Sequence, residues 1–361
     1  MCSMESTQTK SKWKKFVPQA DKATKKGLTE LDYYIIKLLD EYRFLPSSIL
    51  QQLVPAYPKT TSDCLTNLYR KGLVNRFAFL KVRFHDEFIY YLHNHKTLDL
   101  YAQATNTDPN ELNYSVVRYN RESQYHKIND PTEAFKNIGR MANLQHELEI
   151  TKFHAMVELG CVKSGKVELI YWKQGSSLAN KVQAPKVERR REGANETWYE
   201  QQELEYLHHE PDAFFTLRYP ERPPEQQYAH FFLELDRGTE KKPLKVIRKL
   251  RAHFHFIVKQ KLINRHYNIE RLRAVLMLAP DENRMKFLHG LAAHPLVSGK
   301  SASPLFWFSR YDLFQSLETP DEFANRREKP RPLFLARPVI AFSRVWLTPA
   351  QNAPLSLYDA L

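Results

Sequence analysis

The apolar positions that follow the N-terminal tail have the three-to-four-residue spacing of amphipathic helices. The first stripe, behind a helix N-cap at Thr29, consists of Leu31, Tyr34, Ile35, Leu38 and Leu39. A short second helix is expected around 49–53, and a third over 58–71 before Gly72 ends it. Two strand-like runs, 74–82 and 87–92, then predict a β-hairpin.

Three short helices followed by a hairpin are typical of a winged helix-turn-helix, which we expect over residues 28–105. The third helix has a small, polar and basic outward face, as a helix that reads the major groove of DNA requires. The predicted DNA contacts are Thr60, Thr61, Asn67, Arg70 and Lys71 on this helix and Arg76 on the following strand. The same architecture also serves as a protein-docking module, in which the basic face is only a solvated surface.

Farther along, helical and strand-like patterns alternate, which favours an α/β sandwich over residues 141–320. The expected elements are a helix at 141–159, a strand at 166–172, a basic loop at 177–200, strands at 211–215 and 230–238, a helix from Pro243, a buried parallel strand at 274–278, a helix at 282–291, a strand at 305–308 and a helix at 311–317. Residues 1–27 are expected to form a flexible basic arm, 106–140 a connector, and 321–361 a C-terminal extension that packs back as an edge strand or lid.

Two of these strands carry carboxylates where a buried strand should carry none. Asp212 follows Pro211 in the first, and Glu234 and Asp236 lie in the second. Because alternate residues of a strand share a face, Glu234 and Asp236 point the same way, and Asp212 joins them if its strand is the neighbour. Three such charges require a cation or a shared proton, and oxygen ligands favour Mg²⁺, Mn²⁺ or Ca²⁺ over zinc. The alternative is a solvated strand face whose acids pair with the basic helix that follows.

The distribution of positive charge along the chain indicates the kind of partner that the protein binds. The 361 residues carry a formal net charge of +13, and 42% of them are hydrophobic, which is enough for folded cores. Lys and Arg outnumber acids by seven to two in 1–27, by six to one in 58–83 and by eleven to one in 241–273. A mildly acidic body with three basic stripes is typical of a protein that binds nucleic acid.

Other classes are disfavoured. No apolar run approaches the roughly 20 residues that a membrane helix requires, and the N-terminus lacks the apolar segment of a secretion signal. Cys2, Cys64 and Cys161 are far apart and have no metal-ligand spacing. We therefore expect a protein of the reducing cytoplasm without a zinc site.

A helix with Glu147, a strand with Asp212 and a strand with Glu234 resemble the core of the restriction-endonuclease-like PD-(D/E)xK superfamily. The resemblance implies an α/β/α sandwich with a mixed sheet, in which strand carboxylates hold Mg²⁺ or Mn²⁺ and the helical glutamate supports them. The implied metal ligands are Asp212, Glu234, Asp236 and the backbone carbonyl of Leu235.

This chain departs from the superfamily pattern at one position, since Asp236 stands where the catalytic lysine is expected. Lys245 or Lys249, on the following helix, could supply the amine instead. Otherwise Asp236 recruits a second metal ion, or the site is degenerate and binds DNA without cutting it.

Combined with the winged helix, the run Phe232-Leu233-Glu234-Leu235-Asp236-Arg237-Gly238-Thr239-Glu240 is similar to the replication-relaxation family of plasmid and mobile-element proteins and to the MobC type of conjugative relaxase. The resemblance implies binding at an origin of transfer or replication and metal-dependent nicking. It implies double-stranded DNA, single-stranded DNA at an origin and other mobilisation proteins as partners. Further DNA contacts are expected at Lys241, Lys242 and Arg248.

Two alternatives accompany this reading. One is a non-catalytic origin-binding or transcriptional regulator with a degenerate nuclease fold. The other is the histidine–hydrophobe–histidine metal motif of most relaxases, which His253-Phe254-His255 matches as a string. Because residues i and i+2 of a helix point about 160° apart, we expect one packed and one solvated histidine instead. His208-His209, beside Glu210, is a further local candidate for a metal cluster.

A winged helix that reads a palindrome would act as a homodimer.

Overall fold

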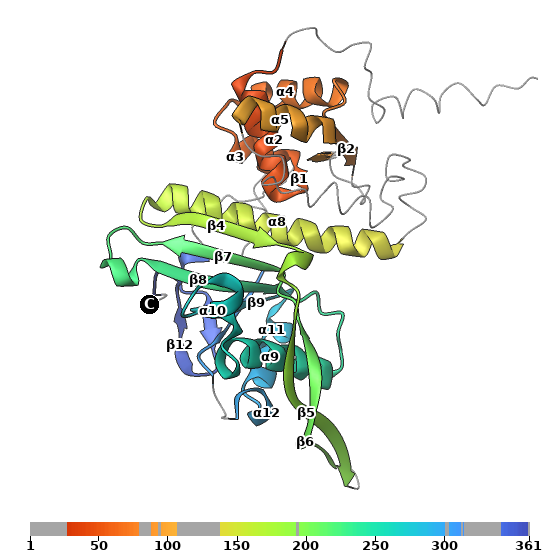
Figure 1. Ribbon diagram of the computed structural model, residues 1–361, viewed down its shortest axis with the longest axis vertical. Coiled ribbons are helices and arrows are strands. Elements are labelled where there is room, and N and C mark those ends of the chain that lie inside the picture. Colours follow the sequence, from red (N-terminus) through yellow and green to blue (C-terminus); the bar gives the residue numbers. More distant parts are fainter. Residues whose placement is uncertain are drawn as a thin grey trace, which may run out of the picture. The chain divides into compact units, whose positions relative to one another are not determined.

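The computed structural model describes residues 27–78, 88–92, 95–106, 138–192, 195–299, 303–311, 313 and 341–359. The chain divides into two compact units, Met1–Ala155 and Met156–Leu361, and the boundary falls within helix α8 (Ile138–Ser164). Figure 1 labels the helices and strands of both units.

The first unit contains short helices and a small antiparallel sheet. Its elements are α2 (Glu30–Tyr42), β1 (Leu45–Pro46), α3 (Ser47–Leu53), α4 (Pro58–Arg70), β2 (Val74–Ala78), β3 (Phe88–Leu92) and α5 (His95–Thr105), with strand order β1-β3-β2. The three predicted helices are confirmed. Thr29 caps α2 with its hydroxyl oxygen, which accepts from the Asp32 amide at 3.2 Å, and Gly72 ends α4 with a φ of 70°. Residues 79–87 of the predicted hairpin lie outside the described part of the chain.

The predicted outward face of α4 is correct in part. Thr60 and Arg70 are exposed, and Asn67 and Lys71 are half-buried. Thr61 was wrongly placed there, because it lies four residues before Leu65 on the buried side of the helix and has no exposed surface.

Arg76 of β2 is packed between two aromatic rings. Its guanidinium lies 4.2 Å from the ring centroids of Tyr69 and Phe88, and it donates to the Tyr90 hydroxyl at 3.3 Å. This predicted DNA contact therefore also has a structural role within the first unit.

The second unit is organised on one mixed sheet, as expected. Its strands are β4 (Glu168–Gln174), β7 (Ala213–Arg218), β8 (Tyr228–Leu235), β9 (Ala274–Ala279), β10 (Phe306–Arg310), β11 (Trp346–Thr348) and β12 (Gln351–Leu355), in the order β12-β11-β10-β9-β8-β7-β4. Strands β4, β7 and β8 form an antiparallel meander, and β8, β9 and β10 are parallel. The wholly apolar β9 is buried along its length, which is what a central parallel strand requires.

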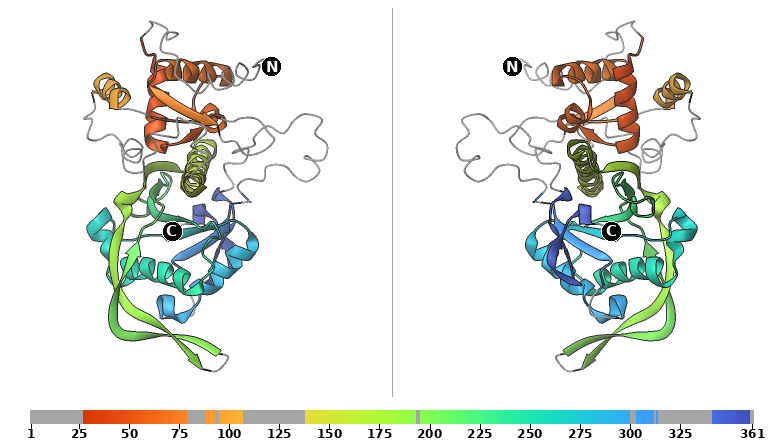
Figure 2. Two further views of the ribbon diagram at one scale, coloured as in Figure 1. Left: turned by 90° about the vertical axis from the view of Figure 1, so that its right-hand side faces the viewer. Right: turned by 90° about the vertical axis from the view of Figure 1, so that its left-hand side faces the viewer.

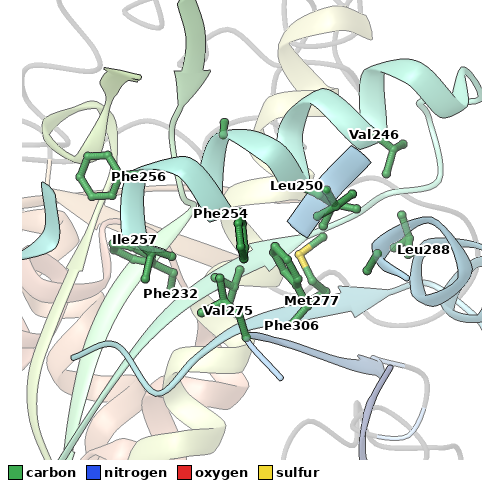
Figure 3. Close-up of a cluster of buried hydrophobic side chains, with 14 of the residues drawn as sticks. Phe232, Val246, Leu250, Phe254, Phe256, Ile257, Val275, Met277, Leu288 and Phe306 are labelled. Atoms are coloured by element: carbon green, nitrogen blue, oxygen red, sulfur yellow. The ribbon is translucent and has the colours of Figure 1, made fainter. Parts of the chain in front are cut away.

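One face of the sheet is covered by helices (Figures 1 and 2). They are α9 (Pro243–Phe254) with its π-helical extension η7 (His255–Lys259), α10 (Leu262–Tyr267), α11 (Glu282–Ala292) and α12 (Pro295–Ser298). Leu250 and Phe254 point from α9 toward Val275 and Met277 on the sheet (Figure 3). Each buried side chain of this size contributes about 1.5–3 kcal/mol, so this stripe fixes α9 on the sheet.

Residues 177–200 were expected to form a loop, and this prediction is wrong. Strands β5 (Asn180–Glu192) and β6 (Asn195–His209) form a long antiparallel hairpin that extends away from the sheet (Figure 1). Charged residues dominate it, which disguises the strand pattern. Lys186 pairs with Glu203 across the hairpin at 2.9 Å, and cross-strand pairs of this kind stabilise a ladder.

Arg251 of α9 anchors this hairpin. Its side chain is 0% exposed, and it pairs with Glu200 of β6. It also donates to the carbonyls of Pro185 in β5, at 2.7 Å, and Leu296 in α12, at 2.6 Å. The guanidinium is therefore buried with three acceptors, which its planar set of donors can satisfy together.

The remaining differences are at the ends of elements. Helix α8 extends beyond the predicted 141–159, and β11 and β12 form the expected C-terminal edge. Most of the predicted helix at 311–317, namely 312 and 314–317, and the segment 319–340 lie outside the described residues. Short 3₁₀ turns occur at Ser176–Leu178, Pro224–Gln226 and Leu357–Asp359. None of the helices that the structure describes is both long and apolar enough to cross a bilayer.

Replacing Arg251 with alanine is expected to lower the free energy of unfolding of this unit by about 2–4 kcal/mol, because two part-buried carbonyls lose their donor and the space of a fully buried side chain is left empty. Urea denaturation followed by tryptophan fluorescence measures the loss. Arg248→Ala is the matched control, because Arg248 is 39% exposed and its pair with Glu205 is worth about 1 kcal/mol or less. Equal losses in the two variants would contradict the anchoring role.

Candidate active site

Glu234 lies near the carboxyl end of β8 and is fully buried. Its side chain is 0% exposed, and its two carboxylate oxygens face two residues of α9. Oε2 pairs with the Lys249 amine, and Oε1 lies 2.7 Å from Nε2 of His253. The expected alternative of a solvent-exposed Glu234 is therefore wrong, whereas its pairing with the following basic helix is correct.

Asp212 immediately precedes β7, the antiparallel neighbour of β8. Its amide donates to the Leu233 carbonyl at 3.0 Å, and Ala213 is the register partner of Leu233. Asp212 therefore lies just before β7, beside the end of β8 that carries Glu234, and the negative charges of both residues act on Lys249. Its Oδ2 accepts from the Leu235 amide at 2.7 Å, which holds the carboxylate at the end of β8.

Asp236 lies just beyond β8 and is held by an arginine that the sequence did not indicate. Both of its carboxylate oxygens accept from Arg284 of α11 at 2.8 Å, and Oδ1 also accepts from the Gly238 amide at 2.6 Å. The hydrogen bond to Asp236 raises the pKa of Arg284 above its ordinary value. This bidentate pair makes Asp236 a fixed part of the edge of the site.

Lys249 is the cation among these acids. Burial opposes the charge on its amine, but the negative charges of Glu234, Asp212 and Asp236 outweigh burial, and the pKa of Lys249 lies above its ordinary value. The Lys249 side chain as a whole is 46% exposed, whereas that of Glu234 has no exposed surface. The three carboxylates therefore converge on an ammonium group of the protein itself.

Two histidines form the inner wall of the site. Burial lowers the pKa of His253 to about 3 and that of His209 to about 2, so both rings are neutral at pH 7. A neutral His253 must carry its proton on Nε2 to donate to Glu234. The His209 ring lies 4.8 Å from that of His253 and stacks on Phe256 at 3.9 Å. The sequence suggested both histidines only as alternative metal ligands and did not predict their position beside Glu234.

Two other predicted catalytic residues, Glu147 and Lys245, and the predicted DNA contact Arg248 pair with residues outside this group of acids. Glu147 belongs to the first unit, where it pairs with Arg43 at 2.8 Å. Lys245 pairs with Glu240 at 3.0 Å on the surface, whereas Lys249 pairs with Glu234, so the structure brings Lys249 and not Lys245 to the acids. Arg248 pairs with Glu205 of the hairpin.

Metal-binding alternatives receive little support from geometry. Within the described residues, no group of three or more His, Cys, Asp or Glu is arranged to hold a metal ion. In the His253-Phe254-His255 string, His253 is buried against Glu234, while His255 is half-buried and burial lowers its pKa to about 4. His208 faces outward, and His209 faces the core.

The neutral histidines make stability depend on pH. Between pH 6.5 and about 2, the unfolded chain binds a proton at residue 209 that the native protein does not, so the free energy of unfolding falls as the pH falls. His209→Phe keeps the stack on Phe256, and we expect it to reduce this loss by up to about 1.4 kcal/mol per pH unit. Thermal unfolding between pH 7 and 4.5 measures it. His208→Phe, an exposed neighbour, is the control, and identical pH profiles would show that residue 209 titrates normally.

The family comparison agrees with this architecture. No curated protein and no solved structure shows a significant match to the chain. The model of the family described as Replication-relaxation matches residues 36–272, which include most of the first unit, the β4–β7–β8 meander and all of α9. A match over more than half of the chain shows membership, and the chain belongs to the replication-relaxation family.

Proposed function

We propose that this protein nicks DNA at an origin of replication or transfer, and that Asp212, Glu234 and Lys249 form the cutting centre. Membership of the replication-relaxation family suggests a role in replication or mobilisation, which involves DNA. The observation that carries the nicking proposal is the position of the Lys249 amine against Glu234. It supplies, from α9, the lysine that is missing two residues after Glu234.

A burial argument supports a functional site. A carboxylate with no exposed surface costs several kcal/mol to desolvate, and its attraction to a lysine often does no more than balance that cost. An apolar residue at position 234 would stabilise the core at least as well as this buried ion pair does. Ionisable groups that are buried against one another in this way are concentrated at functional sites.

A magnesium or manganese ion that is shared with DNA would use the carboxylates of Asp212 and Glu234, and it would have to displace the Lys249 amine from Glu234. Magnesium keeps several waters and is commonly held by one or two carboxylates together with substrate phosphates, so a cage of three protein ligands is not required. Asp212 and Glu234 provide two carboxylates from neighbouring strands. When bound, the ion would lower the pKa of a water and balance negative charge on the phosphate.

In the proposed cutting centre, each side chain has its own role. Asp212 and Glu234 would hold the ion, and His253 orients Glu234 through Nε2. Lys249 keeps its proton at neutral pH, because its pKa is raised, so it acts as a positive charge toward a phosphate and not as a general base. Asp236 is occupied by Arg284, which favours a structural part for it over a second metal site.

A second candidate function follows from the same contacts. Both oxygens of the buried Glu234 already face Lys249 and His253, and both oxygens of Asp236 face Arg284. A centre that is neutralised in this way suits a protein that binds an origin, or regulates transcription there, without cutting it.

Incubation with supercoiled plasmid that carries the protein's own origin separates the two functions. With Mg²⁺ or Mn²⁺, the wild type is expected to produce open circles, and Lys249→Met, Asp212→Asn and Glu234→Gln are expected to reduce the nicking rate by about 100-fold or more. Lys245→Met is the matched control and should stay within about twofold, because Lys245 pairs on the surface with Glu240 and not with the acids of the candidate site. Mobility shifts without open circles in the wild type would establish the second candidate instead.

The first unit is the proposed reader of duplex DNA. Helix α4 follows α3 after a short turn, and the exposed Arg70 and the half-buried Lys71 lie at its C-terminal end. The arrangement of α2, α3, α4 and the β2–β3 pair supports a winged helix-turn-helix that places α4 in the major groove.

Arg70→Ala combined with Lys71→Ala tests this assignment. If both contact phosphates, the slope of log binding constant against log salt should become shallower by about two. Lys37→Ala is the control, because Lys37 pairs with Glu41 on α2 at 3.6 Å and is not expected to contact DNA. An unchanged slope in the double variant would remove α4 from the interface.

A further inference from the structure

The basic stripe 241–273 separates into two groups once its ion pairs are known. Four of its cations have carboxylate partners: Lys245 with Glu240, Arg248 with Glu205, Lys249 with Glu234 and Arg251 with Glu200. These side chains are used by the fold or by the candidate active site. Their charges are largely balanced within the protein.

The other group lies on and around α10. Lys259, Lys261, Arg265 and Arg271 are all exposed, and none of them pairs with a carboxylate anywhere in the described part of the chain. Between residues 258 and 273 the sequence has five Lys or Arg and a single acid, Glu270. We call Lys259, Lys261, Arg265 and Arg271 the α10 basic patch.

A continuous series of ring contacts connects this patch to the candidate active site. Glu234 contacts His253, and the ring of His253 lies 4.8 Å from that of His209. His209 stacks on Phe256 at 3.9 Å, and Phe256 lies 5.6 Å from His266, which is on α10 itself. The patch and the site therefore belong to the same side of the sheet and are separated by three rings.

We propose that the α10 basic patch is a track for the DNA phosphate backbone, which leads the strand to Asp212, Glu234 and Lys249. The inference rests on the proposed action on DNA and adds a second contact surface to that of the first unit. Exposed cations without protein partners can release the counterions of a polyanion, whereas paired cations contribute little. The chemistry is that of phosphodiester recognition without sequence preference.

The test compares two triple variants that change net charge equally. Lys261→Ala/Arg265→Ala/Arg271→Ala removes the track, and Lys245→Ala/Arg248→Ala/Lys286→Ala removes three paired cations, the last of which pairs with Glu282 at 2.7 Å. Binding of the full chain to a duplex is measured in EDTA over a salt series, so that cutting plays no part. The track variant should have a salt slope shallower by about 2–3, and the paired-cation variant a change below about one.

The possible results separate this inference from the nicking proposal. Equal slopes for the track variant and the wild type would overturn the track, whether or not the wild type nicks plasmid. A wild type that fails to nick while the track variant loses its salt dependence would overturn only the nicking proposal. A track variant that loses binding to phosphatidylserine vesicles but keeps full DNA binding would also overturn the inference, in favour of a membrane surface.

Discussion

The buried Glu234 carboxylate is the constraint on which the second unit depends. A negative charge with no exposed surface is tolerated only because an ammonium group and an imidazole N–H reach it from the same helix. Lys249 and His253 are four residues apart and therefore lie on one face of α9. The apolar stripe of α9 determines where that face lies, so the packing of Leu250 and Phe254 against the sheet also positions the charges (Figure 3).

Several of these features could be predicted from sequence because their causes are local. The cap at Thr29, the buried run of β9 and the two carboxylate-bearing strands each follow from short patterns. The convergence of Asp212 with Glu234 required only that their strands be neighbours, which the meander fulfils.

The partners of those acids were harder to predict, because they depend on tertiary packing. Arg284 reaches Asp236 across 48 residues, and nothing in the sequence around either residue indicates the pair. His253 was considered as a metal ligand because of its spacing to His255, and its real partner became clear only when α9 was placed on the sheet. The hairpin was misread as a loop, because polar and charged side chains along both strands, such as the cross-strand pair of Lys186 and Glu203, hide the apolar alternation that normally identifies strands.

The distribution of positive charge acquires a meaning that composition alone does not give. Some cations of the stripe neutralise acids inside the unit, and others remain directed to solvent. Net charge therefore overstates the number of cations that are available to a polyanion. Cations that already pair with a carboxylate of the protein have to be left out of that number.

The anchoring of the β5–β6 hairpin has a mechanical consequence. Arg251, which fastens the hairpin, and Lys249, which faces Glu234, are two residues apart on one helix. If the hairpin moves relative to α9, either the hydrogen bonds of Arg251 break or α9 rotates with the hairpin. Rotation of α9 would move the Lys249 ammonium group away from Glu234. The point at which the hairpin is attached to α9 therefore lies about half a turn of helix from Lys249.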